Sequence, residues 1–482
     1  MMQRKMRRTS VWVSLVALLA GCGGDDGGNG GTFGSTPPPV AGNPTPTPVA
    51  SGPCTLRARQ DWAAAQLREW YLFPETLPTS LDPMPFTSVD TYVDALTATA
   101  RGQRRDRFFT YVTSIAEENA FFQSGSSAGF GFRIALSNNR LFVTESFEGA
   151  PALNAGIDRG AEITGVGTSA ANIRTVSAIL AAEGNAGLSA ALGPNTAGTT
   201  RFLRVVDASG TRDVSVAKAD FALTPVSSRY GAKIIEDGGQ RYGYLNLRTF
   251  ISTADPALRQ AFANFRSNGI TNVVVDFRYN GGGLVSTAEL MGDLLGANRS
   301  TSDVFSFTAF RPEKASNNET DFFAPQPQSI APTRIAFIGT GASASASELV
   351  INAFVPYLRT NMALIGTNTF GKPVGQIALD QPACDDRLRV VAFSTQNADR
   401  QGAYFDGLAT TVPVTCQAGD DIAFPLGDPR EASTRAAIDF LAGRSCTRIA
   451  ADEVRTASAG GRRLLLTPEA PTTVQREVPG AF

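Results

Sequence analysis

The chain has 482 residues, which is long enough for two or three domains with a sizeable core. Hydrophobic residues make up 43% and charged residues 18%, a balance typical of globular rather than disordered proteins. The net charge of −1 provides no basic field for nucleic acid. The chain contains no histidine, which excludes Ser-His-Asp and Cys-His catalytic sites and zinc sites with imidazole ligands. A hydrolase with this sequence must therefore use another base.

Residues 1–21 are predicted to be an export signal, because a basic start precedes an apolar run that is too short to span a bilayer as a mature helix. The run ends in Leu19-Ala20-Gly21-Cys22, which resembles the lipobox of bacterial lipoproteins. The resemblance implies that Cys22 is lipidated; ordinary signal cleavage beside a chance cysteine is the alternative. Gly23 after the cysteine favours the outer membrane, so we expect a lipid-anchored protein of the bacterial cell envelope that faces the periplasm.

Residues 22–53 are rich in glycine and then in proline and threonine, a composition that cannot bury apolar surface, so we interpret them as a stalk. Four cysteines follow Cys22, and an even number in an exported chain favours two disulfides. We expect the pairs Cys384–Cys416 and Cys54–Cys446, the second of which would join the two ends of the folded region. Buried free thiols are the alternative.

Residues 54–125 are predicted to be an N-terminal helical region. An amphipathic stripe from Trp62 to Tyr71 indicates one helix, and a second helix is expected from about Val89 to Ala100.

Residues 126–222 have a different pattern of short strands and glycine-containing turns. Gly129-Phe130-Gly131-Phe132 opens a strand, a short helix is expected before Gly156, and further strands are expected around 141–144, 160–166, 201–206 and 213–217. This order resembles a PDZ domain. The resemblance implies that backbone N–H groups of Gly129, Phe130, Gly131 and Phe132 face the terminal carboxylate of a peptide, which an edge strand then holds. A tight strand entry without any ligand is the alternative for these glycines.

Residues 223–447 alternate between strands and helices, which predicts an α/β domain. Buried strands are expected at 272–277, 334–338 and 363–366, and helices at 286–295 and 347–358. After Thr447 the periodicity is lost, so residues 448–482 are interpreted as a loosely ordered C-terminal extension.

Three segments follow the predicted buried strands and carry candidate chemistry. Gly281-Gly282-Gly283 allows a close backbone approach to a ligand, although a triple glycine alone is often only a tight turn. The segment 341–348 places Ser343, Ser345 and Ser347 at a helix N-terminus, where backbone N–H groups favour a developing negative charge. Helix capping by Ser347 with help from Glu348 is the alternative.

The third segment contains Lys372, whose immediate neighbours are apolar. Desolvation there would lower the pKa of the lysine, so a neutral amine could act as a general base toward a serine. Gly366 to Lys372 also fits the start of a phosphate-binding loop. Because Pro373 supplies neither a hydroxyl nor an N–H and an extended segment follows, we do not expect nucleotide binding. A surface-exposed lysine is the alternative.

Together these segments resemble the carboxyl-terminal processing peptidases, also called tail-specific proteases, over most of residues 55–445. The resemblance implies a crotonase-like β/α superhelix preceded by a PDZ domain, and serine endopeptidase activity on proteins or peptides recognised near their C-termini, without a metal or organic cofactor. The residues that it assigns are Ser345 as nucleophile, Lys372 as base, Gln376 to orient the lysine, and the N–H groups of Ala346 and Gly282 as an oxyanion hole.

Two questions stay open in the sequence. The interval of 27 residues from Ser345 to Lys372 is longer than the family usually has, and a shorter interval would begin at Ser347. The competing function is that of a catalytically inactive, PDZ-containing binding or scaffold lipoprotein. The presence of Ser345, Lys372, Gln376 and the glycine run favours the enzyme.

Overall fold

The computed structural model describes residues 52–450 and 464–482. The expected signal peptide, the lipidation site at Cys22 and all of the stalk up to residue 51 lie outside these residues. Among the helices of the described ranges, none is both long enough and apolar enough to cross a membrane.

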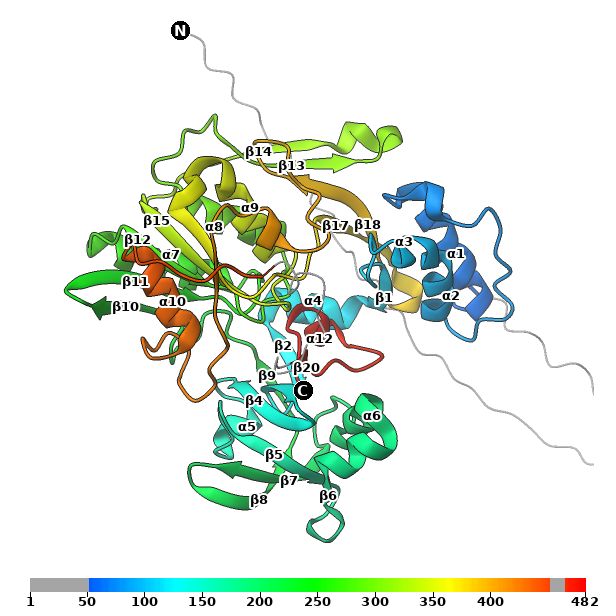
Figure 1. Ribbon diagram of the computed structural model, residues 1–482. Helices are drawn as coiled ribbons and strands as arrows, with labels where there is room; N and C mark the ends of the chain where they lie inside the picture. The colour runs from blue at the N-terminus through cyan, green and yellow to red at the C-terminus, as the bar shows by residue number, and fades with distance from the viewer. Residues whose placement is uncertain (1–51, 451–463) are drawn as a thin grey trace, which may run out of the picture. The chain divides into compact units, whose positions relative to one another are not determined.

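The N-terminal helices pack on a twisted antiparallel sheet (Figure 1). Thr55 and Ser88 cap the first two helices by accepting from Ala58 N–H and Thr91 N–H. The helices are α1 (Leu56–Trp70), α2 (Val89–Leu96) and α3 (Ala98–Gly102), with a 3₁₀ turn η1 (Pro74–Thr76). The sheet contains β1 (Tyr111–Ser114), β13 (Val304–Phe310), β14 (Glu319–Phe322), β17 (Val374–Gln381) and β18 (Asp386–Gln396).

Two expectations for this region are corrected. The helix expected from Val89 to Ala100 divides at Thr97, which caps the end of α2. The region is also not helical throughout, because β1 pairs with β18 before the chain enters α4 (Ile115–Ser124). A four-residue strand is defined by its partner across the sheet, which lies more than 270 residues away and leaves no local signal.

A β-rich lobe follows, with a hydrophobic cluster of its own. Its main sheet has the strand order β20-β3-β4-β5-β7-β8, and a short pair β2-β9 lies beside it. The strands are β2 (Ser126–Gly129), β3 (Phe132–Ser137), β4 (Arg140–Ser146), β5 (Glu162–Gly167), β6 (Arg174–Thr175), β7 (Thr200–Asp207), β8 (Gly210–Ala217) and β9 (Ala219–Ala222). The helices are α5 (Pro151–Asn154), η2 (Ala170–Asn172) and α6 (Val176–Leu192).

The α/β part is built on a six-stranded sheet in the order β10-β11-β12-β15-β16-β19, which is parallel except for β10. Side chains alternate along each strand, so one face packs on α7, α8 and α9 and the other on α10. The strands are β10 (Ala232–Asp237), β11 (Gln240–Asn246), β12 (Asn272–Asp276), β15 (Arg334–Gly339), β16 (Met362–Gly366) and β19 (Thr415–Gln417). The helices are α7 (Ala254–Ser267), α8 (Val285–Leu295), α9 (Ala346–Leu358) and α10 (Ala432–Leu441), with short 3₁₀ turns η3 (Pro312–Asn317), η4 (Arg359–Asn361), η5 (Pro382–Cys384) and η6 (Leu408–Thr410).

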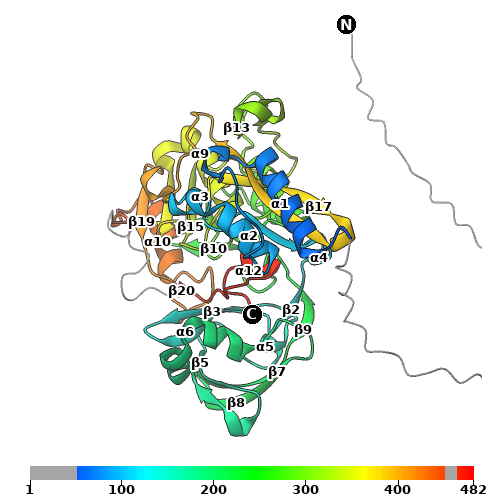
Figure 2. The ribbon, with the colours of Figure 1, turned by 90° about the vertical axis from the view of Figure 1, so that its right-hand side faces the viewer.

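The end of the chain is packed, which corrects the expectation of a loose extension for residues 464–482. It forms β20 (Leu464–Leu465) on β3 and the helix α12 (Thr473–Glu477). Both lie between the β-rich lobe and the α/β part (Figure 2). The apolar residues Val474, Val478 and Ala481 are buried in a cluster with residues from both parts. No sustained period marks this segment, because its partners are surfaces of other elements.

The cysteine pairing expected from the sequence is wrong. The disulfides are Cys54–Cys384 and Cys416–Cys446. Cys384 lies in the turn between β17 and β18, where the start of α1 docks. Cys446 comes after α10 in the chain and lies beside β19, the strand that contains Cys416. Both pairings depend on how helices dock onto sheets, which cysteine spacing does not encode.

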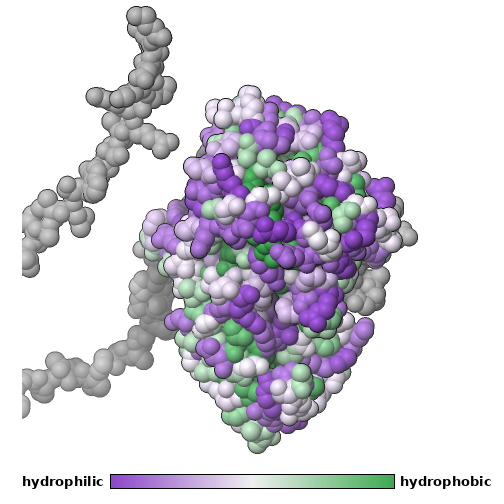
Figure 3. Space-filling model, turned by 90° about the vertical axis from the view of Figure 1, so that its left-hand side faces the viewer, coloured by the Kyte–Doolittle hydropathy of each residue, from purple (hydrophilic) through white to green (hydrophobic). Residues whose placement is uncertain are grey.

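Hydrophilic and hydrophobic residues are mixed over the face in Figure 3. Among the described residues, five large hydrophobic side chains are exposed: Leu56, Met84, Phe108, Phe322 and Leu464.

Candidate functional site

Three loops meet at the carboxyl end of the parallel sheet. They follow β12, β15 and β16, which are neighbours in register, with Asp276 opposite Ile338 and Gly339 opposite Gly366. Since ligands of open α/β sheets bind outside the carboxyl ends of the strands, this edge is where a site is expected. The glycine, serine and lysine segments singled out in the sequence are these three loops.

Of the three serines in the serine loop, one is partly exposed and two are buried. Ser343 and Ser347 are fully buried, and their hydroxyls donate to Phe277 O at 2.7 Å and to Asn280 O at 3.1 Å. Ser345 is partly exposed and precedes α9 with φ of +56°. A positive φ is strained for serine, and strain of this kind is found where surrounding structure fixes a functional side chain.

Lys372 and Gln376, which the family resemblance pairs, are hydrogen-bonded to each other. Lys372 Nζ donates to Gln376 Oε1 at 2.7 Å. The Gln376 amide N–H donates to the carbonyl of Phe109, which leaves the amide oxygen turned toward the lysine. The loop continues into β17 rather than into a helix, so it lacks the geometry of a phosphate-binding loop.

The environment of Lys372 favours the neutral amine. Burial lowers the pKa of Lys372 from its ordinary value, and the Phe109 ring centroid lies 5.0 Å from Nζ. The Glu477 carboxyl has the strongest opposing effect on this pKa, and Arg389 adds to the lowering. Conversely, burial raises the pKa of Glu477, and the positive charges of Lys372 and Arg389 lower it.

Glu348 connects the serine loop to the lysine loop, a role that sequence reasoning missed. Its buried carboxylate accepts from Gly371 N–H and Lys372 N–H, both at 2.7 Å, and from Ser345 N–H at 3.1 Å. Burial raises the pKa of this carboxyl, and hydrogen bonds with the Thr369 side chain and with the three backbone N–H groups lower it. In the sequence Glu348 reads as an ordinary residue in the first turn of a helix, and no local signal marks its second partner. Within residues 52–450 and 464–482, no hydrogen bond joins the Ser345 and Lys372 side chains.

The glycine loop lies against Ser345. Gly282 has φ of +120°, and a Cβ there would stand 2.7 Å from Ser345 Cβ and 3.2 Å from Ala346 N. Its N–H, expected as an oxyanion donor, instead donates to Asn280 Oδ1 at 2.9 Å. The neighbouring N–H of Gly281 donates to the Glu477 carbonyl at 3.2 Å. Ala346 is the first residue of α9, so its N–H has no acceptor within the helix.

The loop from Gly129 to Phe132 lies in the β-rich lobe and not beside Ser345. The expectation was that its N–H groups face a peptide, and Gly131 N–H does donate to a carbonyl oxygen, that of Phe482, at 2.9 Å. Gly131 has φ of +75°, while Phe130 and Phe132 are fully buried in the lobe.

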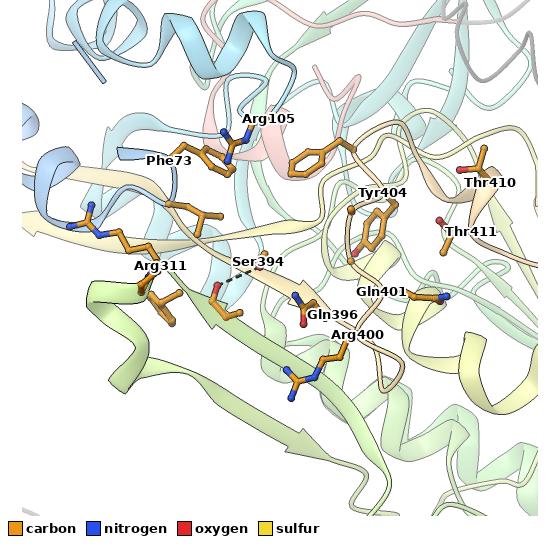
Figure 4. A pocket seen from close by; sticks show the side chains of 17 residues that line it. Phe73, Arg105, Arg311, Ser394, Gln396, Arg400, Gln401, Tyr404, Thr410 and Thr411 are labelled. Atoms are coloured by element: carbon orange, nitrogen blue, oxygen red, sulfur yellow. Dashed lines mark hydrogen bonds between the residues drawn. The ribbon is translucent and has the colours of Figure 1, made fainter. Parts of the chain in front are cut away.

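Two cavities lie near these elements. One, of about 670 Å³, is lined by Lys372, Gly281 and Ala344 and is walled on one side by residues of the C-terminal segment, Glu477 among them. The other, of about 790 Å³, contains Phe73, Arg105 and Tyr404 in its wall (Figure 4). Of the sequence-predicted site residues, Lys372 lines the first cavity and none lines the second, so the first one is the candidate active site.

Comparisons with known proteins point to the same loops. Residues 241–413 match the model of peptidase family S41. A chloroplastic C-terminal processing peptidase of Tetradesmus obliquus is 27% identical over 53% of this chain and 54% of its own length. The carboxy-terminal processing protease CtpA of Bacillus subtilis (strain 168) is 24% identical over 53% of this chain and 49% of its own length. The matched part thus spans about half the length of these relatives.

The fold is also found in a solved structure. A crystal structure from Bacteroides fragilis NCTC 9343, assigned to the S41 proteases, superposes with a TM-score of 0.63 at 21% identity and covers 79% of this chain and 97% of that one. This similarity establishes the mixed α/β S41 fold.

Proposed function

We propose that the chain is a serine endopeptidase of peptidase family S41, whose model residues 241–413 match, and that it uses Ser345 and Lys372 to cleave polypeptides recognised near their C-termini. One observation carries the proposal: Ser345 is the accessible serine of its loop, and Glu348 holds its backbone to that of Lys372.

In the proposed mechanism Ser345 Oγ attacks the scissile carbonyl while the neutral Lys372 amine takes the hydroxyl proton. The amine keeps its lone pair for this proton, because toward Gln376 it acts as a donor. The resulting ammonium gives the proton to the leaving amine, so the peptide bond breaks and an acyl-enzyme forms. A water molecule then attacks the ester and loses a proton to Lys372; as the ester C–O bond breaks, Lys372 returns this proton to Ser345 Oγ and the new C-terminal carboxyl group is released.

The negative charge on the tetrahedral intermediate needs two donors. We place one at Ala346 N–H, at the positive end of α9. As the second donor we choose the N–H of Gly281 rather than that of Gly282. The Gly281 N–H already donates to a carbonyl oxygen, whereas the Gly282 N–H donates to the Asn280 side chain. In this arrangement Gly282 supplies the close backbone approach to Ser345.

The remaining expectations enter as parts of the same proposal. The β-rich lobe, residues 126–222, is a PDZ-like domain; residues 223–447 form a crotonase-like peptidase core. Residues 1–21 are a lipoprotein signal peptide, and Cys22 anchors the protein in the cell envelope, in the outer membrane facing the periplasm. The hydrogen bonds of Gly131 at the strand edge support the proposal that the β-rich lobe is PDZ-like.

Mass spectrometry of a small unfolded protein with an apolar C-terminus, after incubation with the full chain, tests the activity. We expect fragments from the wild type and none from Ser345→Ala or Lys372→Met. Ser347→Ala is the matched control and should still cut, since its hydroxyl donates to a buried carbonyl. Fragments from Ser345→Ala would refute the assignment of the nucleophile. No cleavage by any form, together with retained binding of C-terminal peptides, would favour the scaffold function.

A further inference from the structure

The edge of β3 in the β-rich lobe is occupied by the last residues of the chain. Phe482 N–H donates to Phe132 O at 3.0 Å, Gly131 N–H donates to Phe482 O at 2.9 Å, and Ile134 N–H donates to Gly480 O at 2.9 Å. These bonds alternate along the edge as in an antiparallel pair. Residues 480–482 therefore pair with the edge of β3 through an isolated antiparallel bridge, the same kind of pairing by which peptides bind to exposed sheet edges.

The Phe482 side chain fills an apolar position of the lobe. It is 4% exposed and belongs to the same cluster as Phe130 and Phe132. The loop is shaped closely to it, because a Cβ on Gly129 would stand 2.9 Å from the Phe482 carbonyl carbon. An aromatic residue is thus held by backbone hydrogen bonds and by burial together.

The C-terminal segment, residues 464–482, also contacts the catalytic loops. Residues 464–466 also lie on the β3 edge, and between them and residues 480–482 the chain leaves the edge and forms α12. At the end of α12 the Glu477 carbonyl accepts from Gly281 N–H at 3.2 Å, and Glu477 lines the same cavity as Lys372.

Further contacts fix this path. Thr473 N–H donates to the Glu117 carboxylate at 2.9 Å, the Gln475 amide donates to Ala481 O at 3.0 Å, and buried Arg133 donates to Pro479 O at 3.0 Å. The segment is bound along its length and not only at its last residue.

A substrate needs the groups that this segment uses. Each backbone N–H of β3 has one proton to donate, so a peptide cannot pair with Gly131 and Ile134 while residues 480–482 do. Likewise a scissile carbonyl cannot approach Gly281 while Glu477 occupies its N–H.

Resting on the proposed function, we propose that residues 464–482 are an intrachain ligand that closes the groove and the catalytic centre together, and that substrates must displace it. The substrates best suited to do so are unfolded chains with an aromatic or large apolar residue that can replace Phe482. A ligand in the same chain competes at an effective concentration on the order of millimolar, so free peptides of similar fit bind weakly until it leaves.

The test uses Phe482→Asp in the full chain, which puts a charge into the apolar position, with Ala470→Asp as the matched control because Ala470 is an exposed residue of the same segment. The probe is a fluorescent synthetic peptide with the sequence of residues 471–482, and binding is followed by anisotropy in a Ser345→Ala background. We expect its Kd to fall about tenfold or more in Phe482→Asp and to stay unchanged in Ala470→Asp. Equal peptide binding by wild type and Phe482→Asp would overturn the proposal.

A second variant guards against misfolding. Phe482→Ala keeps the backbone and removes only the ring, and circular dichroism and the unfolding midpoint show whether each variant is folded. In forms that keep Ser345, we expect kcat/KM on an unfolded protein to rise about tenfold, and the added peptide to inhibit the variant. Binding does not require catalysis, so a gain in peptide binding without any proteolysis would refute the proposed enzyme while upholding the occupied groove. Unchanged binding and unchanged cleavage in folded Phe482→Ala would refute the intrachain ligand.

Discussion

Glu348→Gln tests whether the link between the serine and lysine loops positions the catalytic groups. The carboxylate accepts three backbone N–H groups: the buried one of Gly371 on Oε1, and the partly buried ones of Lys372 and Ser345 on Oε2. A glutamine has one acceptor oxygen. If that oxygen keeps the two N–H groups on the Oε2 side, the glutamine NH2 faces Gly371 N–H and leaves it without an acceptor.

The magnitude follows from the hydrogen bonds. One unsatisfied buried N–H costs about 1–3 kcal/mol, and the loss of charge assistance at the other two adds about 1 kcal/mol. We therefore expect the free energy of unfolding to fall by about 2–4 kcal/mol, measured by urea denaturation with an unchanged m-value. Because displaced reacting groups lose rate steeply, kcat should fall about 100-fold with little change in KM.

Glu431→Gln is the matched control. Glu431 is also a fully buried carboxylate that accepts backbone N–H groups, from Ser433 and Thr434 at the start of α10, on the other face of the sheet. It is in addition paired with the buried Arg278 guanidinium, so Glu431→Gln should destabilise the protein at least as much as Glu348→Gln, by about 3–5 kcal/mol, and change kcat much less. If both variants lose stability and kcat in equal proportion, or if Glu348→Gln keeps the wild-type kcat, Glu348 is a structural cap and the positioning argument is refuted.

Three further predictions concern other parts of the chain. Burial and neighbouring carboxylates raise the pKa of Glu289 to about 7 from 4.5, so the folded state favours the protonated form and stability should fall as pH rises through this window. Glu289→Gln should remove that fall and, after screening, gain about 1–2 kcal/mol at pH 8 in denaturant titrations; a loss at pH 8 would contradict this. Replacing Cys416 and Cys446 by alanine opens a link between residues 30 apart and should lower the free energy of unfolding by about 3–4 kcal/mol, whereas an unchanged denaturation midpoint would count against the pairing. Gly282→Ala should lower kcat about 100-fold, because its Cβ would stand 2.7 Å from Ser345 Cβ at a φ of +120°, and full activity in a peptide assay would show that the loop yields.

Much of the α/β part could be predicted from the sequence, because its signals are local. The buried strand at β12 is a run of consecutive apolar residues, and the alternation of such strands with amphipathic helices predicts parallel pairing. That pairing brings strand ends to one edge, so the sequence also predicted that the loops with Ser345 and Lys372 meet. Lys372 lies in the loop before β17 and Gln376 is on that strand, so their hydrogen bond joins residues only four positions apart.

What only the tertiary structure decided depends on partners far away in the chain. Glu348 binds a loop more than 20 residues on, Cys54 pairs with a turn 330 residues away, and β1 exists only against β18. The segment 464–482 has no strong periodicity of its own, since its hydrogen bonds and buried surface are supplied by β3 and by the catalytic loops. Local sequence determines which residues can form an element or donate a proton; the free energy that selects one partner among many comes from the packed whole.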